Sequence, residues 1–191
     1  MRLNKKEGYG EMFVLETQRL ILRQYKDEDI TSLHHIFSDL ETIKFYPAPF
    51  SIQQTQDWMK RNQDRYRNDG YGLWMDCLKE TNELIGDCGL VKQKINDSIE
   101  VEIGYHINKK YWAKGFATEA AKACKEYAFY KLGLNKLISI IDPKNVPSIR
   151  VAEKIGFTKE KEVFIFGKNH YIYSGLKKVT KGYLMNGGIV K

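Results

Sequence analysis

Residues 111–121 read YWAKGFATEAA and mark the point where a strand gives way to a helix. The run at residues 101–107 is typical of a strand, and helical spacing of apolar or small residues follows it at Ala117, Ala120, Ala121, Cys124 and Ala128. The first turn of a helix leaves backbone N–H groups without partners and carries partial positive charge. Gly115 allows a ligand to approach those groups closely, and Thr118 adds a hydroxyl donor. The stretch predicts a phosphate or pyrophosphate cradle, although a purely structural glycine turn has the same pattern.

Length and composition predict one globular domain. The chain has 191 residues, of which 42% are hydrophobic and 13% aromatic, as in folded proteins. No apolar run approaches the ~20 residues that span a bilayer, and the charged start does not resemble a signal peptide. The three cysteines, Cys77, Cys88 and Cys124, lack the spacing of metal ligands. We therefore expect a cytoplasmic protein with buried free thiols and no metal.

The net charge of +7 raises the question of an anionic partner. Four lysines lie among the last fifteen residues, at positions 177, 178, 181 and 191, so a solvated basic tail is the simplest interpretation. A basic rim that attracts a polyanionic cofactor is the alternative. A nucleic-acid-binding protein is a further hypothesis, but the chain shows no helix-turn-helix, zinc or RNP pattern, and we expect no direct nucleic-acid partner.

The order of elements predicts an α+β fold. Residues 1–12 are expected to form a flexible N-terminal arm, residues 13–176 the domain, and residues 177–191 the basic C-terminal tail. Alternation and turn residues predict strands at 19–25, 72–78, 84–93, 99–107, 136–141, 162–166 and 170–173. Helices are predicted at 27–38, from Ser51 with its Gln54 capping box to about 69, from Gly115 to about 132, and from about Pro147 to Gly156. The result is a twisted, mixed sheet of about seven strands with helices on both faces.

Candidate catalytic groups gather around the glycine turn. In the strand IEVEIGYHI, Glu100, Glu102 and His106 share one face. A partly buried carboxylate near an anion cradle is a candidate general base, while a salt-bridged strand residue is the alternative; we favour the latter for Glu100, and both remain open for Glu102. Asn145 and Ser148 lie at another strand-to-helix junction. The sequence contains neither G-x-G-x-x-G nor a Walker lysine pattern, which argues against NAD- and ATP-type sites.

The sequence contains three blocks, LETQRLILR, EIGYHINKKYWAKGFATEA and NVPSIRVAEKIGF, within about residues 15–173. Together, in this order and spacing, they closely resemble the GNAT superfamily of acyl-CoA-dependent N-acetyltransferases, and most nearly its ribosomal-protein N-terminal (alanine/serine) acetyltransferases. The resemblance implies a single GNAT-type domain whose fourth and fifth strands splay apart to admit the pantetheine arm of acetyl-CoA. It also implies a cofactor site at Tyr105, His106, Ile107, Trp112, Ala113, Lys114, Gly115, Phe116, Ala117, Thr118, Asn145 and Ser148.

The resemblance further implies direct attack by an amine on the thioester, with Glu102 as general base and Ser148 assisting the thiolate. Phe45 and Tyr46 are expected on the acceptor side. Two departures stand out: Trp112 replaces the usual Gln or Arg, and Ala152 replaces the tyrosine that serves many members as general acid. The expected acceptor is a protein or peptide α-amine such as a ribosomal-protein N-terminus, with a polyamine or aminoglycoside as the alternative. A non-catalytic CoA-binding module and a monomeric or homodimeric state also stay open.

Overall fold

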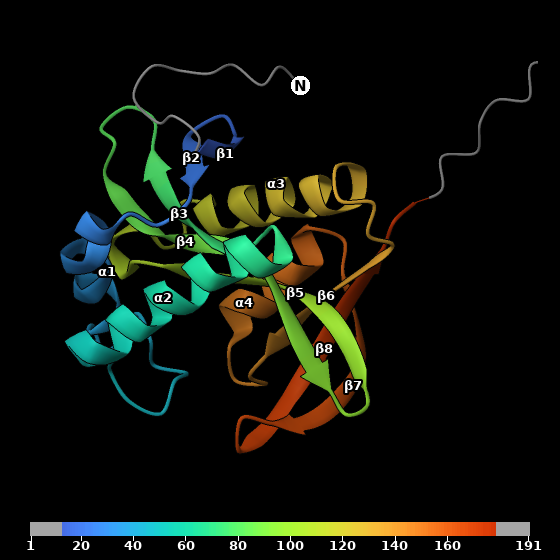
Figure 1. Cartoon of the computed structure of the whole chain (residues 1–191). Helices are drawn as coiled ribbons and strands as arrows, with labels where there is room; N and C mark the ends of the chain where they lie inside the picture. Colours follow the sequence, from blue (N-terminus) through green and yellow to red (C-terminus); the bar gives the residue numbers. More distant parts are fainter. Residues whose placement is uncertain (1–12, 179–191) are drawn as a thin grey trace, which may run out of the picture.

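Eight strands form one mixed sheet in the order β1-β2-β3-β4-β5-β6-β8-β7 (Figure 1). The computed structural model describes residues 13–178, so the predicted arm at 1–12 and the predicted tail beyond Lys178 lie outside the described residues. The strands are β1 Phe13–Glu16, β2 Leu20–Arg23, β3 Leu73–Leu78, β4 Leu84–Ile95, β5 Ser98–Ile107, β6 Lys136–Ile141, β7 Thr158–Ile165 and β8 Lys168–Leu176. The helices are α1 Ile30–Phe37, α2 Ile52–Asp69, α3 Phe116–Tyr130 and α4 Val146–Lys154, with 3-10 turns at Asp27–Asp29 and Lys109–Tyr111.

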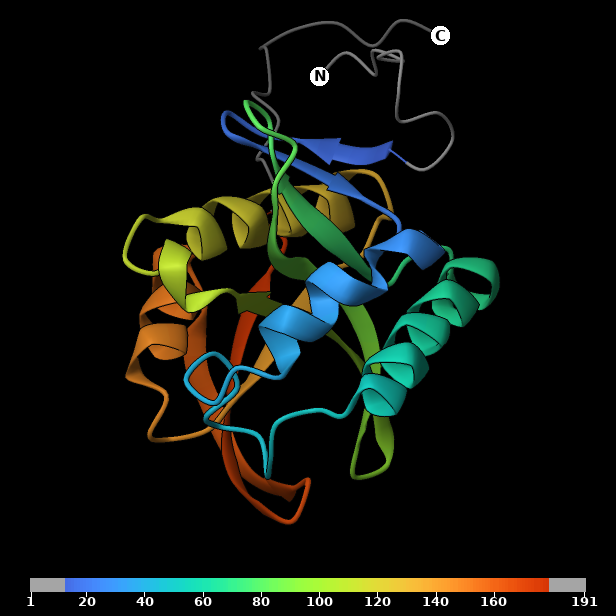
Figure 2. The same ribbon diagram turned by 90° about the vertical axis from the view of Figure 1, so that its left-hand side faces the viewer.

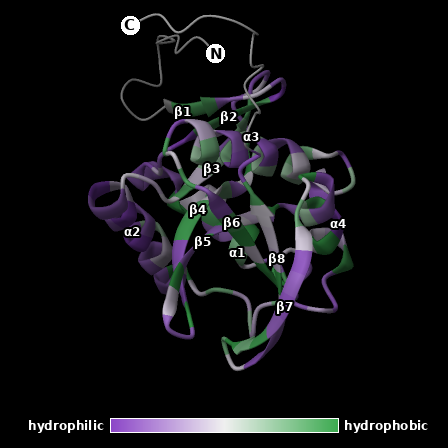
Figure 3. Ribbon diagram, turned by 90° about the vertical axis from the view of Figure 1, so that its right-hand side faces the viewer, coloured by the Kyte–Doolittle hydropathy of each residue, from purple (hydrophilic) through white to green (hydrophobic). Residues whose placement is uncertain are grey.

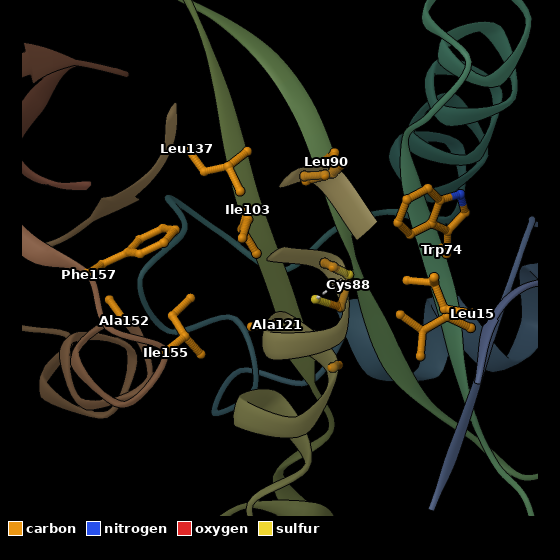
Figure 4. Packing of buried hydrophobic residues seen from close by; sticks show 14 of the residues in the cluster. Leu15, Trp74, Cys88, Leu90, Ile103, Ala121, Leu137, Ala152, Ile155 and Phe157 are labelled. Atoms are coloured by element: carbon orange, nitrogen blue, oxygen red, sulfur yellow. Dashed lines mark hydrogen bonds between the residues drawn. The ribbon is translucent and has the colours of Figure 1, made fainter. Parts of the chain in front are cut away.

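Helices cover both faces of the sheet, as the sequence predicts (Figure 2). Helices α1 and α2 pack on the face that carries Leu73, Met75 and Cys77. Helices α3 and α4 pack on the opposite face, where Trp74 and Ile103 contribute from the strands. Figure 4 shows this second core, with Ala152 of α4 and Ile155, which follows α4, on one side and Trp74 on the other. Among residues 13–178, no helix is both long and apolar enough to cross a membrane.

Local sequence signals explain several boundaries. The Ser51 hydroxyl accepts from Gln54 N and the Gln54 side chain accepts from Ser51 N, so the predicted capping box is confirmed. Gly70, with φ +77°, ends α2 in the left-handed conformation that glycine adopts without strain. Figure 3 shows hydrophilic residues along α2 and β7, in contrast to the central strands. Charge on β7, which lies at the sheet edge, opposes pairing with another chain.

The sequence prediction misses strand β1 and the first residues of β7. The sheet has eight strands instead of about seven, because Phe13–Glu16 pairs antiparallel with β2. This strand has four residues, too few for a clear alternating pattern. Strand β7 begins at Thr158, four residues before the predicted start, because its charged residues hide the strand pattern. All three cysteines are buried free thiols, as predicted.

The splay that the resemblance implies is present between β5 and β6. These parallel strands, predicted at 99–107 and 136–141, share one registered pair, Glu102 with Ile138. In contrast, β5 pairs with β4 along its whole length, from Ser98 to Ile107. The ladder on the β6 side therefore ends at Glu102, and the second half of β5 runs along an opening in the sheet.

Asp76 is a fully buried carboxyl on β3, and neither of its oxygens has a hydrogen-bond partner among the described residues. Burial raises its pKa well above the usual value, and the charges of Asp87 and Glu119 add to the effect. The folded protein therefore holds a proton that the unfolded chain releases above pH ~4. Asp76 thus costs stability progressively as the pH rises from that value toward the folded-state pKa.

We predict that Asp76→Asn stabilises the protein increasingly as the pH rises, because the amide cannot ionise. The difference in free energy of unfolding between variant and wild type should grow by up to about 1.4 kcal/mol per pH unit in that window. Urea unfolding at several pH values between 5 and 8 measures it. Asp142→Asn is the control: burial opposes ionisation there too, but Lys168 lowers the Asp142 pKa, so this variant should lose stability. A pH-independent effect of Asp76→Asn would contradict the assignment.

Candidate active site

The opening between β5 and β6 exposes backbone groups of β5. Asn108 N donates to Ile85 O of β4 at 2.8 Å, and in an antiparallel pair such bonds recur at every second residue. The intervening residues of β5 therefore turn their N–H and C=O groups toward β6. Ser139 Oγ of β6 donates to Ile103 O at 3.0 Å, which agrees with this alternation. The backbone of Tyr105 and Ile107 consequently lies along the opening, whereas the backbone of His106 faces β4.

The loop after β5 presents backbone amides at the start of α3. Ala113 and Gly115 have positive φ values of 59° and 83°, and such turns curl successive N–H groups around a hollow. Gly115 is the N-cap of α3 and has no side chain to accept from the first turn. The N–H groups of Phe116, Ala117 and Thr118 therefore have no partner from a capping side chain. This is the geometry that the sequence predicts for an anion cradle.

Trp112 fastens this loop to the strand. Its indole N–H donates to Ile107 O at 2.6 Å, so the loop folds back on the end of β5. The indole replaces the usual Gln or Arg with a structural contact, and the Lys44 ammonium lies 5.4 Å from the ring centroid. Lys114 lies over the ring of Tyr111, 5.0 Å from its centroid, which keeps a positive charge at the loop.

A clamp that the sequence analysis did not predict holds the same loop from the other side. Arg19 Nε donates to Glu119 Oε2 at 2.7 Å, and Arg19 NH1 donates to Lys114 O at 3.0 Å. Thr17 Oγ1 donates to Glu119 Oε1 at 2.6 Å, and the guanidinium lies 4.2 Å from the Phe116 ring centroid. Burial opposes ionisation of Glu119, but its hydrogen bonds to Thr17 and Arg19 lower its pKa, so it stays charged. The turn between β1 and β2 thus fixes the first turn of α3.

The start of α4 lies across the opening from β5. Asn145 caps this helix, accepting from Ser148 N at 3.2 Å, as its place at a strand-to-helix junction suggests. The Tyr105 hydroxyl donates to Ser148 O at 2.9 Å, which joins β5 to α4. Ala152 has no ionisable group and is fully buried in the core, so this position supplies no general acid. The structure therefore brings Tyr105, Asn145 and Ser148 together on the face covered by α3 and α4.

Glu102 lies at the point where the two strands part, on the face covered by α1 and α2. Its Oε2 accepts from Gln93 Nε2 at 2.7 Å, and its Oε1 accepts from Ile140 N at 3.3 Å. Burial raises the Glu102 pKa above its usual value, outweighing these two hydrogen bonds. A partly buried carboxylate with a raised pKa is suited to accept a proton near neutral pH. Glu100 instead pairs with Lys136 at 3.0 Å, the salt-bridged role favoured from the sequence.

The loop between α1 and α2 covers this face (Figure 2). The Tyr46 hydroxyl lies 2.6 Å from His106 Nε2, so Tyr46 and Glu102 approach the same face of β5. Phe45 is attached through its carbonyl, which accepts from Lys168 Nζ at 2.8 Å. The backbone of His106 is paired with β4, so His106 contributes to the site through its side chain.

A separate hollow of about 920 Å³ lies beside α1 and the turn between β3 and β4. Its lining includes Arg23, His35 and Lys110 but none of the residues predicted for the site. The candidate site is therefore defined by the opening in the sheet and the amide-rich loop, not by this hollow.

The model of the acetyltransferase (GNAT) domain matches residues 19–158. The chain belongs to the GNAT family of acetyltransferases. Its relatives include the uncharacterized protein YkkB of Bacillus subtilis, 37% identical over 83% of this chain and 93% of YkkB. Spermidine N(1)-acetyltransferase of Escherichia coli is 42% identical over 74% of each chain. The crystal structure of a GNAT-family acetyltransferase from Bacillus anthracis superposes with a TM-score of 0.72, at 30% identity, over 86% of this chain and 98% of that one.

Family membership makes the chain an N-acetyltransferase that uses acetyl-CoA as its donor. The residues present fit that donor. Amides without side-chain caps at residues 116–118 suit the diphosphate, and the unpaired edge of β5 at Tyr105 suits the amide-containing pantetheine arm. Among residues 13–178, no group of three or more His, Cys, Asp or Glu side chains is placed to hold a metal ion.

We predict that Arg19→Met weakens CoA binding about tenfold, because the Lys114 carbonyl and Glu119 lose charged hydrogen bonds that shape the loop. Titration calorimetry with CoA measures the change. The matched control is Arg67→Met, since Arg67 is an exposed arginine on α2 that pairs with Asp64. Equal affinity of the Arg19 variant and the wild type would show that the clamp does not organise the loop.

Proposed function

We propose that the protein transfers the acetyl group of acetyl-CoA to a primary α-amine of a peptide or protein, with Glu102 as general base. The observation that carries this proposal is the carboxylate of Glu102, partly buried at the fork between β5 and β6. It lies opposite the face on which Tyr105 and Ser148 meet, so a donor and an acceptor can enter from opposite sides.

Acetyl-CoA supplies an activated thioester when bound. We assign its diphosphate to residues 112–118 and its pantetheine arm to the edge of β5 that β6 leaves unpaired, at Tyr105 and the Ile107 N–H. We assign its thioester end to the neighbourhood of Asn145 and Ser148. Glu102 removes a proton from the incoming ammonium, directly or through a water, since an α-amine of pKa about 8 is largely protonated at neutral pH. A backbone N–H near Ile107 stabilises the developing oxyanion, and Ser148 donates to the departing thiolate.

Charge on the acceptor side supports an acceptor with a single amine. Asp142 pairs with Lys168 at 2.6 Å, and Asp39 pairs with Lys109 at 2.7 Å, so each of these carboxylates already has a cation. Arg65 lies close enough to Glu102 to affect its pKa. A polycation would have to compete with Lys168, Lys109 and Arg65 for the nearby carboxylates, whereas a peptide N-terminus carries one positive charge. A ribosomal-protein N-terminus, as the sequence resemblance implies, is one such acceptor.

A polyamine is the second candidate acceptor. The observation that favours it is the 42% identity to an enzyme named for spermidine acetylation. Thiol release from acetyl-CoA, measured side by side with N-terminal peptides, polyamines and aminoglycosides, separates the two. We expect the highest kcat/KM with a peptide. CoA binding without thiol release from any amine would instead indicate a non-catalytic CoA-binding module.

We predict that Glu102→Gln lowers kcat about 10²-fold at pH 7 without changing CoA affinity, because the amide cannot accept the proton. The wild-type rate should fall as the pH drops through the raised Glu102 pKa, whereas the rate of the variant should follow deprotonation of the amine itself, with a pKa of about 8. Glu100→Gln, at an ion-paired residue on the same strand, is the matched control and should keep its rate. An unchanged kcat for Glu102→Gln across pH 6–9 would remove Glu102 from the mechanism.

A further inference from the structure

A chain of three side chains leads from the core to the acceptor side of the site. Asp87 of β4 and His106 of β5 are directly opposite in the strand register, and His106 Nδ1 lies 2.6 Å from Asp87 Oδ1. The other ring nitrogen, Nε2, lies 2.6 Å from the Tyr46 hydroxyl. Both contacts have the short length typical of strong hydrogen bonds.

The surroundings of Asp87 fix the direction of these hydrogen bonds. Asp87 is fully buried, and its second oxygen accepts from Tyr25 OH at 2.5 Å and from Trp58 Nε1 at 3.2 Å. Because Oδ2 of Asp87 already has two donors, its other oxygen, Oδ1, is suited to accept a hydrogen bond from His106 Nδ1–H. Nδ1 therefore carries the proton, and Nε2 is left as the acceptor for the Tyr46 O–H.

The other groups around His106 are mostly uncharged rings. Phe37 of α1 and Trp58 of α2 lie with their centroids 5.5 Å and 5.4 Å from the imidazole, in edge-on contact. The titratable groups that face it are Asp87 from β4, Tyr46 from the loop and, at longer range, Glu102 on its own strand. A positive charge that forms on His106 thus has Asp87 as its direct counter-ion.

Tyr46 is suited to pass a proton on and not to keep or lose one. Burial raises its pKa, and the negative charges of Asp87 and Glu102 raise it further, so the phenolate is disfavoured. Its oxygen has lone pairs available to accept from a donor while its own hydrogen points at Nε2. The loop that holds Tyr46 is also attached to β8 through Lys168 and the Phe45 carbonyl, which fixes its place over the sheet.

We propose that Tyr46, His106 and Asp87 form a proton relay that takes the second proton from the acceptor nitrogen. This inference rests on the proposed acetyltransfer to an amine. Conversion of an ammonium, R–NH3+, into an amide, R–NH–CO–CH3, releases two protons from nitrogen. Glu102 takes the first and creates the nucleophile. After the N–C bond forms, the N–H bond of the adduct breaks toward the Tyr46 oxygen as the Tyr46 hydrogen moves to Nε2. The C–S bond then breaks, one proton ends on the CoA thiol, and the other leaves to solvent.

Glu102 takes only one of the two protons, because a carboxyl group that has been protonated is no longer a base. The Cα atoms of Glu102 and His106 are four residues, about 13 Å, apart along β5, and the two side chains lie on the same face of the strand. Both oxygens of Glu102 already accept a hydrogen bond. The Tyr46 hydroxyl contacts His106 Nε2, and Tyr46 lies near enough to Glu102 for the charge of Glu102 to raise its pKa.

Loss of the relay and loss of Glu102 should change the pH dependence of kcat in different ways, and this difference is the basis of the test. We compare Tyr46→Phe, His106→Gln and Glu102→Gln with the wild type by thiol release, using an alanine-starting peptide between pH 6.5 and 9.5. We expect the loss of kcat in Glu102→Gln to shrink above the amine pKa of about 8, because solution then supplies the free amine. The losses in Tyr46→Phe and His106→Gln, about 10²-fold each, should persist at every pH, and the double variant should be no worse than either single one.

Tyr130→Phe is the matched control, because Tyr130 is an exposed tyrosine on α3 and loses the same hydroxyl. Urea unfolding and CoA calorimetry verify that each variant is folded. A Tyr46→Phe enzyme with wild-type kcat, or with only a higher KM for the peptide, would overturn the relay and leave the hydroxyl with the role of attaching the loop. A loss that disappears at high pH, as for Glu102→Gln, would also overturn it. If the wild type released no thiol with any amine, the proposed function itself would fail.

Discussion

The structure depends on a parallel ladder that stops after one pair. Glu102 and Ile138 hold β5 and β6 together, and beyond them the strands separate. Two side-chain contacts bridge the fork, Ser139 Oγ to Ile103 O and Ile140 N to the Glu102 carboxylate. The carboxylate therefore satisfies a backbone donor that regular pairing would have used. The same group is structural at the fork and the candidate base of the site, because the sheet opens at that residue.

The pleat of β5 separates the two halves of the chemistry. Tyr105 points to the α3 and α4 face and contacts Ser148, whereas Glu102 and His106 point to the α1 and α2 face. Backbone groups between them line the opening. Under the proposed function, β5 contacts the donor on one face and the acceptor on the other, and the two substrates meet at the opening in the sheet.

Short-range patterns predicted much of this arrangement. The Gly115 turn and the helical spacing after it located the amide-rich loop, and the Ser51 capping box located α2. The sequence could not reveal contacts between distant segments. Arg19 and Glu119 are 100 residues apart, and neither has a local pattern that predicts their pairing. In the sequence, Asp87 likewise resembles any other polar residue in a strand, and only the strand register shows that it lies opposite His106. Such pairings come from tertiary packing, which periodicity does not encode.

The three cysteines lie on both sides of the sheet. Cys77 belongs to the core under α1 and α2, whereas Cys88 and Cys124 lie 3.6 Å apart in the core under α3 (Figure 4). A thiol reagent reaches none of them while both layers stay closed. The labelling rate of Cys77 therefore measures how often the α1 and α2 layer opens. The labelling rates of Cys88 and Cys124 measure separately how often the α3 and α4 layer opens.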